Sequence, residues 1–375
     1  MKKHNSQGLS LVVAGLVLAF GLISNRPAMA AGTGALRVGV ARMTHGHVWD
    51  VLDALEKGKV EIVGVYEPDP VVAAKFKNRP DLADVPFFDD LGEMVDKTRP
   101  EVVTAYGSIV EHLGVVEVCA PRGVHVMVEK PLAYSMEQGL AIDSLARKNG
   151  IQVVTNYATT WFPAFHAAYE VVRGLGEIGD IRKVVIHDGH FGPQEIGCSQ
   201  EFLAWLTDPV GNGGGALIDF GCYGASLMTW LMDGEAPLSV TAVTQQIKPD
   251  VYPKVDDEAT IVLTYPKAQA IIQASWNWPY DRKDMFIYCK DSYAFAPTGR
   301  TLLVRAGREG KEEAREVVPL DEPYNNAFSY LTAVVRGQVT PSSTDLSGLE
   351  ANMTVTRILD AARISAKEGR TVNLR

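Results

Sequence analysis

The sequence has few cysteines, and their spacing carries no motif. Four occur among 375 residues, at positions 119, 198, 222 and 289, with no Cys-x-x-Cys pair and no histidine at zinc-finger spacing. A disulfide scaffold is therefore excluded, and free thiols are expected. The sequence also lacks repeats and low-complexity stretches, and its 46% hydrophobic and 22% charged residues are typical of a globular protein. At this length two domains are expected, because single cores stop growing at roughly 250 to 300 residues.

Basic residues are too few to favour a nucleic-acid partner. The formal charge is −9, and the first 30 residues contain Lys2, Lys3 and Arg26 but no acid. The remaining 345 residues therefore carry 33 bases and 45 acids, a net charge of −12. Such a surface repels phosphate backbones, so we expect a small-molecule partner and no nucleic acid.

The longest apolar run lies at the very start of the chain. Lys2 and Lys3 precede an uncharged run over residues 9–23, and small residues follow at Ala28 and Ala30. This order predicts a Sec-type signal peptide over residues 1–30 and a secreted or periplasmic protein. The run is short for a membrane span, which needs roughly 20 residues, but an uncleaved N-terminal anchor remains an alternative.

From residue 36 to residue 155, apolar runs alternate with amphipathic segments. Val48, Val51, Leu52 and Leu55 share one face of a predicted helix. Buried strands are predicted at 36–41, 60–66, 101–105, 124–128 and 151–155. This alternation predicts a doubly wound parallel sheet, in which ligands bind at the carboxyl ends of the strands.

The pattern changes over residues 156–375, which we predict to be a second, α+β domain. Helices are expected at 162–174, 213–234, 323–336 and 346–368. Strands are expected at 181–190, 238–247, 259–265, 268–278, 284–290 and 301–305. Consecutive strands joined by turn residues indicate a large, mainly antiparallel sheet.

The loop after the first strand lacks the Gly-x-Gly-x-x-Gly fingerprint of dinucleotide sites. Its three glycine positions hold Arg42, Thr44 and His47. Amides at the helix start, with the side chains of Arg42 and Thr44, can still donate to phosphate, although a scaffold that has lost its cofactor is an alternative. Glu67, at the end of the second strand, can accept hydrogen bonds from ribose and favours NAD over NADP. His45 and His47 flank a glycine, but without a third ligand they predict no metal site.

Two other segments carry reactive side chains. The strand 124–128 runs into Glu129-Lys130-Pro131, so Lys130 is expected at the ligand-binding edge of the sheet, where an ammonium can polarise a hydroxyl or carbonyl. A glycine-rich segment leads to Asp219 and Tyr223, which lie four residues apart and on one face of a predicted helix. Taken alone, such a pair is more often an ordinary helix surface.

Together, Glu129-Lys130-Pro131 and the segment Gly214-Gly215-Ala216-Leu217-Ile218-Asp219-Phe220-Gly221 resemble the Gfo/Idh/MocA family of sugar oxidoreductases. The resemblance covers residues 36–375 and implies a Rossmann-type domain, a bound nicotinamide dinucleotide and hydride transfer at a hydroxyl carbon of a sugar or cyclitol. It implies that Lys130, Asp219 and Tyr223 are catalytic, with Tyr223 where most members have histidine. A phenol with a pKa near 10 would donate a proton, or would act as a base if Lys130 lowered that pKa.

The resemblance and the strand ends together predict which residues contact ligands. Expected cofactor contacts are Arg42, Met43, Thr44, His45, Glu67, His112, Glu129 and Lys130. Expected substrate contacts are Asn156, Trp161 and His190, with Trp276 facing the same cleft, because aromatic faces suit sugar C–H surfaces.

Three functions are open. Export conflicts with a freely exchanging cofactor, so the first is an oxidoreductase that keeps its NAD tightly bound. The second is an NAD-dependent glycosidase that acts by transient oxidation and elimination. The third is a sugar-binding protein without redox activity. The resemblance also implies dimers or tetramers formed through the second sheet, where residues 268–278 are apolar enough for a covered face.

Overall fold

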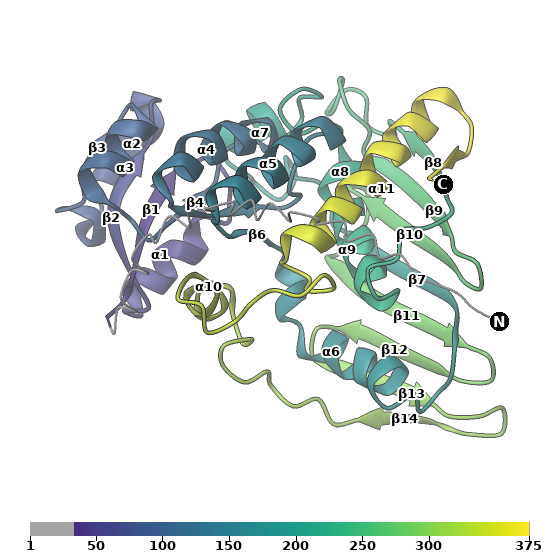
Figure 1. Cartoon of the computed structure of the whole chain (residues 1–375). Helices are drawn as coiled ribbons and strands as arrows, with labels where there is room; N and C mark the ends of the chain where they lie inside the picture. The colour runs from purple at the N-terminus through teal and green to yellow at the C-terminus, as the bar shows by residue number, and fades with distance from the viewer. Residues whose placement is uncertain (1–33, 375) are drawn as a thin grey trace, which may run out of the picture. The chain divides into compact units, whose positions relative to one another are not determined.

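The computed structural model describes residues 34–374, so the predicted signal peptide lies outside the described residues. Two sheets dominate the described chain (Figure 1). No helix within residues 34–374 combines the length and the apolar character that crossing a membrane requires. All four cysteines are free thiols, as predicted.

The first sheet has six parallel strands in the order β3-β2-β1-β4-β5-β6. Its strands are β1 (Leu36–Ala41), β2 (Val60–Tyr66), β3 (Phe87–Phe88), β4 (Val102–Ala105), β5 (His125–Glu129) and β6 (Val153–Asn156). This is the strand order of a Rossmann fold and confirms the predicted fold class. Only β3 was not predicted, because two residues are too few to produce a periodic pattern.

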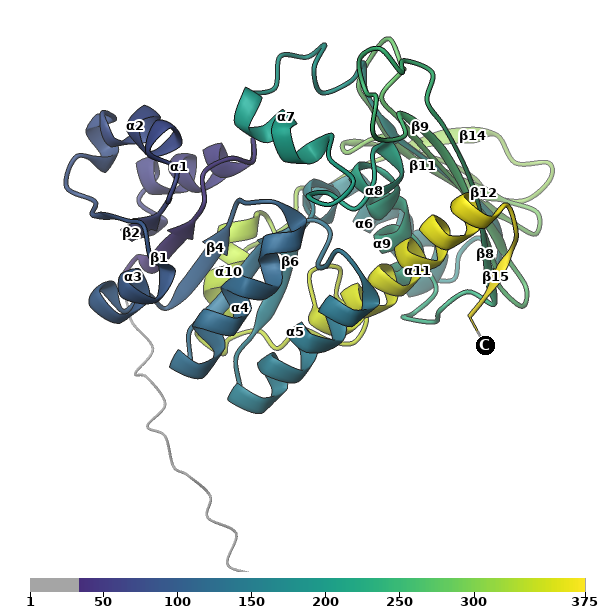
Figure 2. The same cartoon turned by 90° about the horizontal axis from the view of Figure 1, so that it is seen from above.

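Helices cover both faces of this sheet, as Figures 1 and 2 show. One face packs against α1 (Val48–Glu56) and α2 (Pro70–Lys77), and the other against α3 (Leu91–Thr98), α4 (His112–Cys119) and α5 (Met136–Asn149). Near the end of the chain, α10 (Ala327–Val335) returns and buries Phe328 and Leu331 in the core on the α1 side. A late segment therefore completes the first domain.

The second sheet has nine strands in the order β14-β13-β12-β11-β7-β10-β9-β8-β15. Its strands are β7 (Ile181–Gly189), β8 (Ser239–Gln245), β9 (Glu258–Thr264), β10 (Gln269–Ser275), β11 (Arg282–Cys289), β12 (Tyr293–Thr298), β13 (Thr301–Arg305), β14 (Glu312–Arg315) and β15 (Val372–Asn373). All neighbours are antiparallel except β7 and β10, which confirms the predicted mainly antiparallel sheet.

One face of the second sheet packs against α6 (Pro163–Tyr169), α9 (Gly221–Leu231) and α11 (Leu349–Glu368), and α11 also contacts α5 of the first domain. Gly369 ends α11 in the left-handed conformation with φ 63°, as its position predicted. The other face carries stacked aromatic rings, with Phe286 lying 4.2 Å from Tyr288 and 4.8 Å from Phe295 between ring centroids. Tyr288 is 41% exposed, so apolar surface remains on that face.

One predicted helix was wrong, and one helix was missed. The predicted helix 213–234 is divided at Phe220 into α8 (Ala216–Asp219) and α9, so Asp219 and Tyr223 do not share one helix face. A short helix, α7 (Gln200–Leu206), was not predicted, because seven residues give too little periodicity.

Glycines allow the segments that carry Asp219 and Tyr223 to pack closely. A Cβ atom on Gly215 would lie 1.7 Å from the carbonyl oxygen of Asp256, whose carboxylate accepts hydrogen bonds from the Gly215 and Leu217 amides. A Cβ atom on Gly224 would lie 2.4 Å from Ile272 on β10. The glycine-rich segment is therefore required by close packing beneath the site.

Candidate active site

Lys130 and Asp219 form a buried ion pair between the two domains. The Lys130 ammonium donates to Oδ1 of Asp219 and, at 2.9 Å, to its carbonyl oxygen, and both side chains are buried. Trp276 donates from Nε1 to Oδ2 of Asp219 at 2.9 Å. Trp276 is fully buried behind Asp219, so the prediction that it faces the cleft was wrong.

The ion pair keeps both partners charged. Burial alone would raise the pKa of Asp219, but the charge and hydrogen bond of Lys130 hold that pKa at about 2. Burial opposes the charge on Lys130 as well, yet the adjacent Asp219 carboxylate raises the pKa of the ammonium above its usual value. Two of its three protons are engaged by Asp219, which leaves one for another acceptor.

Tyr223 lies beside this pair with its ring between two ammonium groups. The ring centroid is 5.2 Å from Nζ of Lys130 and 3.8 Å from Nζ of Lys283. Burial, with the nearby Cys222 and Asp219, raises the pKa of Tyr223 well above its ordinary value despite these cations. Tyr223 is therefore a neutral phenol that can donate a proton, and the alternative that Lys130 lowers its pKa does not hold.

Lys283 and Asp188 are a second ion pair at the site that the sequence did not reveal. They face each other across β11 and β7, with Nζ of Lys283 2.8 Å from Oδ1 of Asp188. Burial raises the pKa of Asp188 to about 6 even though Lys283 opposes that shift. No motif marks either residue, because their meeting depends on the register of two strands about 95 residues apart.

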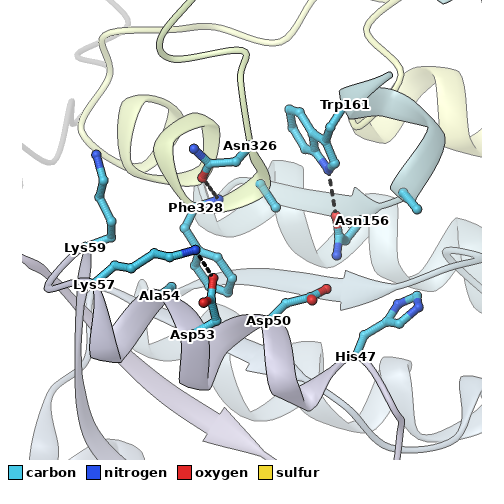
Figure 3. A pocket seen from close by; sticks show the side chains of 12 residues that line it. His47, Asp50, Asp53, Ala54, Lys57, Lys59, Asn156, Trp161, Asn326 and Phe328 are labelled. Atoms are coloured by element: carbon cyan, nitrogen blue, oxygen red, sulfur yellow. Dashed lines mark hydrogen bonds and ion pairs between the residues drawn. The ribbon is translucent and has the colours of Figure 1, made fainter. Parts of the chain in front are cut away.

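The predicted substrate contacts line two different cavities. His190 lines a cavity of about 810 Å³ together with Phe220, Tyr280 and Lys283. Asn156 and Trp161 instead line a cavity of about 460 Å³ between α1 and α10, shown in Figure 3. The sequence predicted that these three residues share one cleft, whereas the structure places them at two separate cavities.

Asn156 also connects this second cavity to Glu129. Its Nδ2 donates to Oε1 of Glu129 at 3.0 Å, and its Oδ1 accepts from Nε1 of Trp161 at 3.2 Å. Both residues therefore orient Glu129 from the cavity wall.

The loop after β1 has the backbone shape of a dinucleotide-binding loop, but most of its N–H groups are not available to a phosphate. Arg42, at the first glycine position, has the left-handed φ of 66° that glycine usually supplies. The backbone N–H groups of residues 42, 43, 44, 45, 47 and 48 are all hydrogen-bonded within the protein. The prediction that helix-start amides point outward to phosphate was therefore wrong for these residues in this conformation.

Arg42 and Glu67, the side chains predicted to contact the adenosine half of the cofactor, form ion pairs and hydrogen bonds within the protein. Arg42 pairs with Glu67 at 2.6 Å and with Glu111 at 3.1 Å, and the Glu67 carboxylate is fully buried while it also accepts from the Met43 amide. Burial raises the pKa of Glu67, although Arg42 opposes the shift. The Glu67 carboxylate is therefore occupied, and one face of the Arg42 guanidinium is paired with it.

Helix α7 of the second domain covers this loop, and Figure 2 shows it beside the strand end. Nε1 of Trp205 donates to Oγ1 of Thr44 at 3.1 Å, which in turn donates to the carbonyl of Tyr106. His45 packs against Phe202, with ring centroids 4.6 Å apart. A cavity of about 350 Å³ remains between the loop and residues 197–202.

The reacting end of the crevice nevertheless fits a polar ligand. Among the described residues, Nε2 of His112 and the hydroxyl of Tyr157 are buried without a hydrogen-bond partner. Tyr157 meets the ring of Tyr223 edge-on at 5.7 Å, and Nδ1 of His112 is held by the carbonyl of Leu132. The unpaired Tyr157 hydroxyl, on a ring that contacts Tyr223, is a polar group that the nicotinamide half of a dinucleotide could satisfy, whereas the phosphates would require Arg42 or α7 to move.

Glu129 brings a third potential metal-ligand atom close to the two histidines of the loop, which the sequence did not indicate. His45, His47 and Glu129 each offer a ligand atom, and these atoms lie within 4.8 Å of one another. Nδ1 of His47 is 2.7 Å from Oε2 of Glu129. Glu129 comes from β5, so the sequence around the histidines gave no sign of it.

Two family profiles match the chain. The profile of the oxidoreductase family with an NAD-binding Rossmann fold matches residues 34–157, and the profile of the GFO/IDH/MocA C-terminal domain matches residues 165–294. The first match covers the Rossmann-type domain, and the second covers part of the domain that follows it.

Among curated proteins, a trans-1,2-dihydrobenzene-1,2-diol dehydrogenase of Xenopus tropicalis is 30% identical over 168 residues, 44% of this chain and 46% of that protein. Matches to enzymes of the same name cover at most 66% of their length.

Among solved structures, an aldose-aldose oxidoreductase from Caulobacter crescentus, complexed with glycerol, has a TM-score of 0.75 at 20% identity over 91% of this chain and 100% of that one. The WlbA dehydrogenase from Bordetella pertussis, in complex with NADH and UDP-GlcNAcA, has a TM-score of 0.72 at 17% identity, over 91% of this chain and 99% of that one. At these identities the likeness concerns the fold.

Proposed function

The chain belongs to the Gfo/Idh/MocA family of NAD-binding oxidoreductases, and from that membership we propose that it transfers a hydride to or from a hydroxyl carbon of a sugar or cyclitol. The observation that carries the proposal is the convergence of Lys130, Asp219 and Tyr223 from both domains. An ammonium and a neutral phenol beside one crevice are the groups that a carbonyl oxygen requires during reduction.

Each residue of this trio has a separate task. Bound NAD(H) supplies the hydride donor or acceptor. Lys130 holds the substrate oxygen with its remaining N–H, and Asp219 fixes the ammonium in place and keeps it charged. Tyr223 donates the proton in the reductive direction, because its raised pKa keeps it protonated at neutral pH.

The cavity lined by Phe220 and Lys283, both of which lie against the ring of Tyr223, supports this substrate class. Its volume of about 810 Å³ accommodates a sugar, and its lining combines the aromatic faces of Phe220 and Tyr280 with the polar groups of His190 and Lys283. The names of two relatives, a dihydrobenzenediol dehydrogenase and an aldose-aldose oxidoreductase, also point to hydroxyl carbons.

We also propose export and a retained cofactor. The basic and apolar order of residues 1–30 supports a secreted or periplasmic location, where free NAD is scarce. The cover that α7 forms over the loop supports slow release of a bound dinucleotide, since the Trp205 to Thr44 hydrogen bond would have to break. The aromatic surface around Phe286 supports a dimer or tetramer formed through the open face of the second sheet.

One observation favours a second function, that of a sugar-binding protein without redox activity. The backbone amides of residues 42–45, 47 and 48 are hydrogen-bonded within the chain, and Arg42 pairs with the Glu67 carboxylate. A protein that no longer binds NAD would retain this closed arrangement, because nothing would reopen it.

The dinucleotide content of the purified protein separates these functions. We expect denaturation to release NAD(H), detected by absorbance and mass, in near-stoichiometric amount. Absence of dinucleotide, together with no thermal shift on adding NAD, would refute the oxidoreductase proposal and support the binding protein. If NAD is present, release of the aglycone from aryl glycosides without net NADH would identify the glycosidase alternative.

A further inference from the structure

Three side chains from separate segments meet where β1 and β5 end. His45 and His47 lie in the loop after β1, and Glu129 is the last residue of β5. Their nearest imidazole nitrogens and carboxylate oxygens lie within 4.8 Å of one another. His45 and Glu129 are almost fully buried, whereas the His47 side chain is 34% exposed.

We propose that His45, His47 and Glu129 bind one divalent transition-metal ion. Two imidazoles and one carboxylate are the ligand set of many zinc sites that keep an open position, and of non-haem iron sites as well. Three protein ligands leave further positions for water or a ligand oxygen. His45 and Glu129 are also among the cofactor contacts expected from the sequence, but this inference rests on the donor set, and its test measures metal binding without added NAD.

The present geometry is close to what a metal requires. Bonds from such an ion to nitrogen or oxygen are about 2.0 to 2.2 Å long, so two ligands of one ion lie about 3 to 4 Å apart. His47 and Glu129 are now 2.7 Å apart and share a hydrogen bond, while the His47 amide donates to Nδ1 of His45 at 3.0 Å. An ion replaces these hydrogen bonds after shifts of about 1 Å and displaces the proton between His47 and Glu129.

The surroundings orient the ligands and leave a route to solvent. Asn156 donates to Oε1 of Glu129 at 3.0 Å and is itself held by Trp161, so the carboxylate has the outer support usual at metal sites. His47 lines the cavity of about 460 Å³, and Figure 3 shows Asp50 and His47 extending toward the same space. Asp50 therefore adds a negative charge to the cavity that leads to the site.

The matched control is another histidine paired with a carboxylate. His187 lies 2.8 Å from Asp284 in the second domain, the same kind of contact as His47 with Glu129. Within the described residues, the set of His45, His47 and Glu129 is the one group of three potential ligands with this spacing. A histidine–carboxylate pair alone should therefore not retain a metal.

The test uses the full chain, purified without a histidine tag and treated with EDTA. Calorimetric titration with Zn²⁺ should show one ion per chain, and Co²⁺ should give the visible absorption of a nitrogen- and oxygen-ligated ion. His45→Gln and His47→Gln should each weaken Zn²⁺ binding at least tenfold, whereas His187→Gln should bind as the unmodified chain does. Zn²⁺ should also raise the Tm of the unmodified chain and of His187→Gln, but not that of the loop variants.

Two results would overturn the proposal. One is the absence of saturable binding by the unmodified chain at micromolar Zn²⁺ and Co²⁺. The other is binding that His45→Gln and His47→Gln leave unchanged, which would place the ion elsewhere on the chain. His47 lies at a cavity wall, so His47→Gln is expected to fold even if His45→Gln, at a buried position, does not. In that case Zn²⁺ binding by His47→Gln alone tests the proposal.

Discussion

Replacing Asp219 with asparagine tests whether the two domains are joined by a buried ion pair at the site. The substitution keeps the side-chain shape and an oxygen for Trp276 but removes the charge opposite Lys130. Removing one partner of a buried pair typically costs about 3 to 5 kcal/mol of folding free energy. Because the carbonyl of residue 219 still accepts from Lys130, we expect a loss near the lower limit, about 3 kcal/mol.

Urea unfolding at pH 7, followed by tryptophan fluorescence, measures this loss. Asp53→Asn is the control, since Asp53 forms an exposed pair with Lys57 and its loss should cost less than about 1 kcal/mol. The double variant Lys130→Met with Asp219→Leu should recover much of the lost stability, because no buried charge is left unpaired. If the loss in this double variant equalled the sum of the losses in Lys130→Met and Asp219→Leu alone to within about 0.5 kcal/mol, the two residues would not interact, and the reasoning would be refuted.

The pH dependence gives an independent check of the same pair. The folded pKa of Asp219 is about 2, below the ordinary value of 3.8. Its contribution to stability is therefore complete above about pH 4 and is lost as the pH falls toward 2. The difference in unfolding free energy between the native chain and Asp219→Asn should shrink over that range, and a constant difference would contradict the assigned shift.

Three further predictions concern residues around this pair. Tyr223→Phe should lower kcat at least tenfold with an unchanged circular dichroism spectrum, because it removes the proton donor; unaltered turnover would exclude Tyr223 from the mechanism. In the native chain, stability should decline as the pH rises from about 4 to 6, because the folded pKa of Asp188 is about 6 and the unfolded chain, with the ordinary 3.8, loses this proton first. Asp188→Asn should abolish that decline. Unfolding curves measured at several pH values in that interval give the change of unfolding free energy with pH. If Asp188→Asn shows the same change, another titrating group causes it. Gly224→Ala should destabilise the protein by about 1 to 3 kcal/mol in urea, since its Cβ would lie 2.4 Å from Ile272; a neutral result would mean that α9 can move away from β10 without cost.

The sequence by itself indicated the parallel first sheet, the mainly antiparallel second sheet, the approximate ends of most strands in the first sheet and the family. Hydrophobic periodicity is a local property, so β1 and β2 were predicted at their observed bounds and Lys130 was placed at the ligand-binding edge. Segments too short for periodicity, such as β3 and α7, gave no comparable signal.

Only the tertiary structure decided which side chains meet. Glu129 lies 82 residues from His47, and Lys283 lies 95 residues from Asp188, so no local pattern links either pair. Strand register and packing bring these side chains together. The same packing places Trp205 against Thr44, so the loop after β1 is covered, although the sequence had predicted that its amides face a phosphate. Contacts between distant segments depend on how whole elements bury their apolar faces, which is why Lys130, Asp219 and Tyr223 could be named from sequence motifs whereas Lys283 and Asp188 could not.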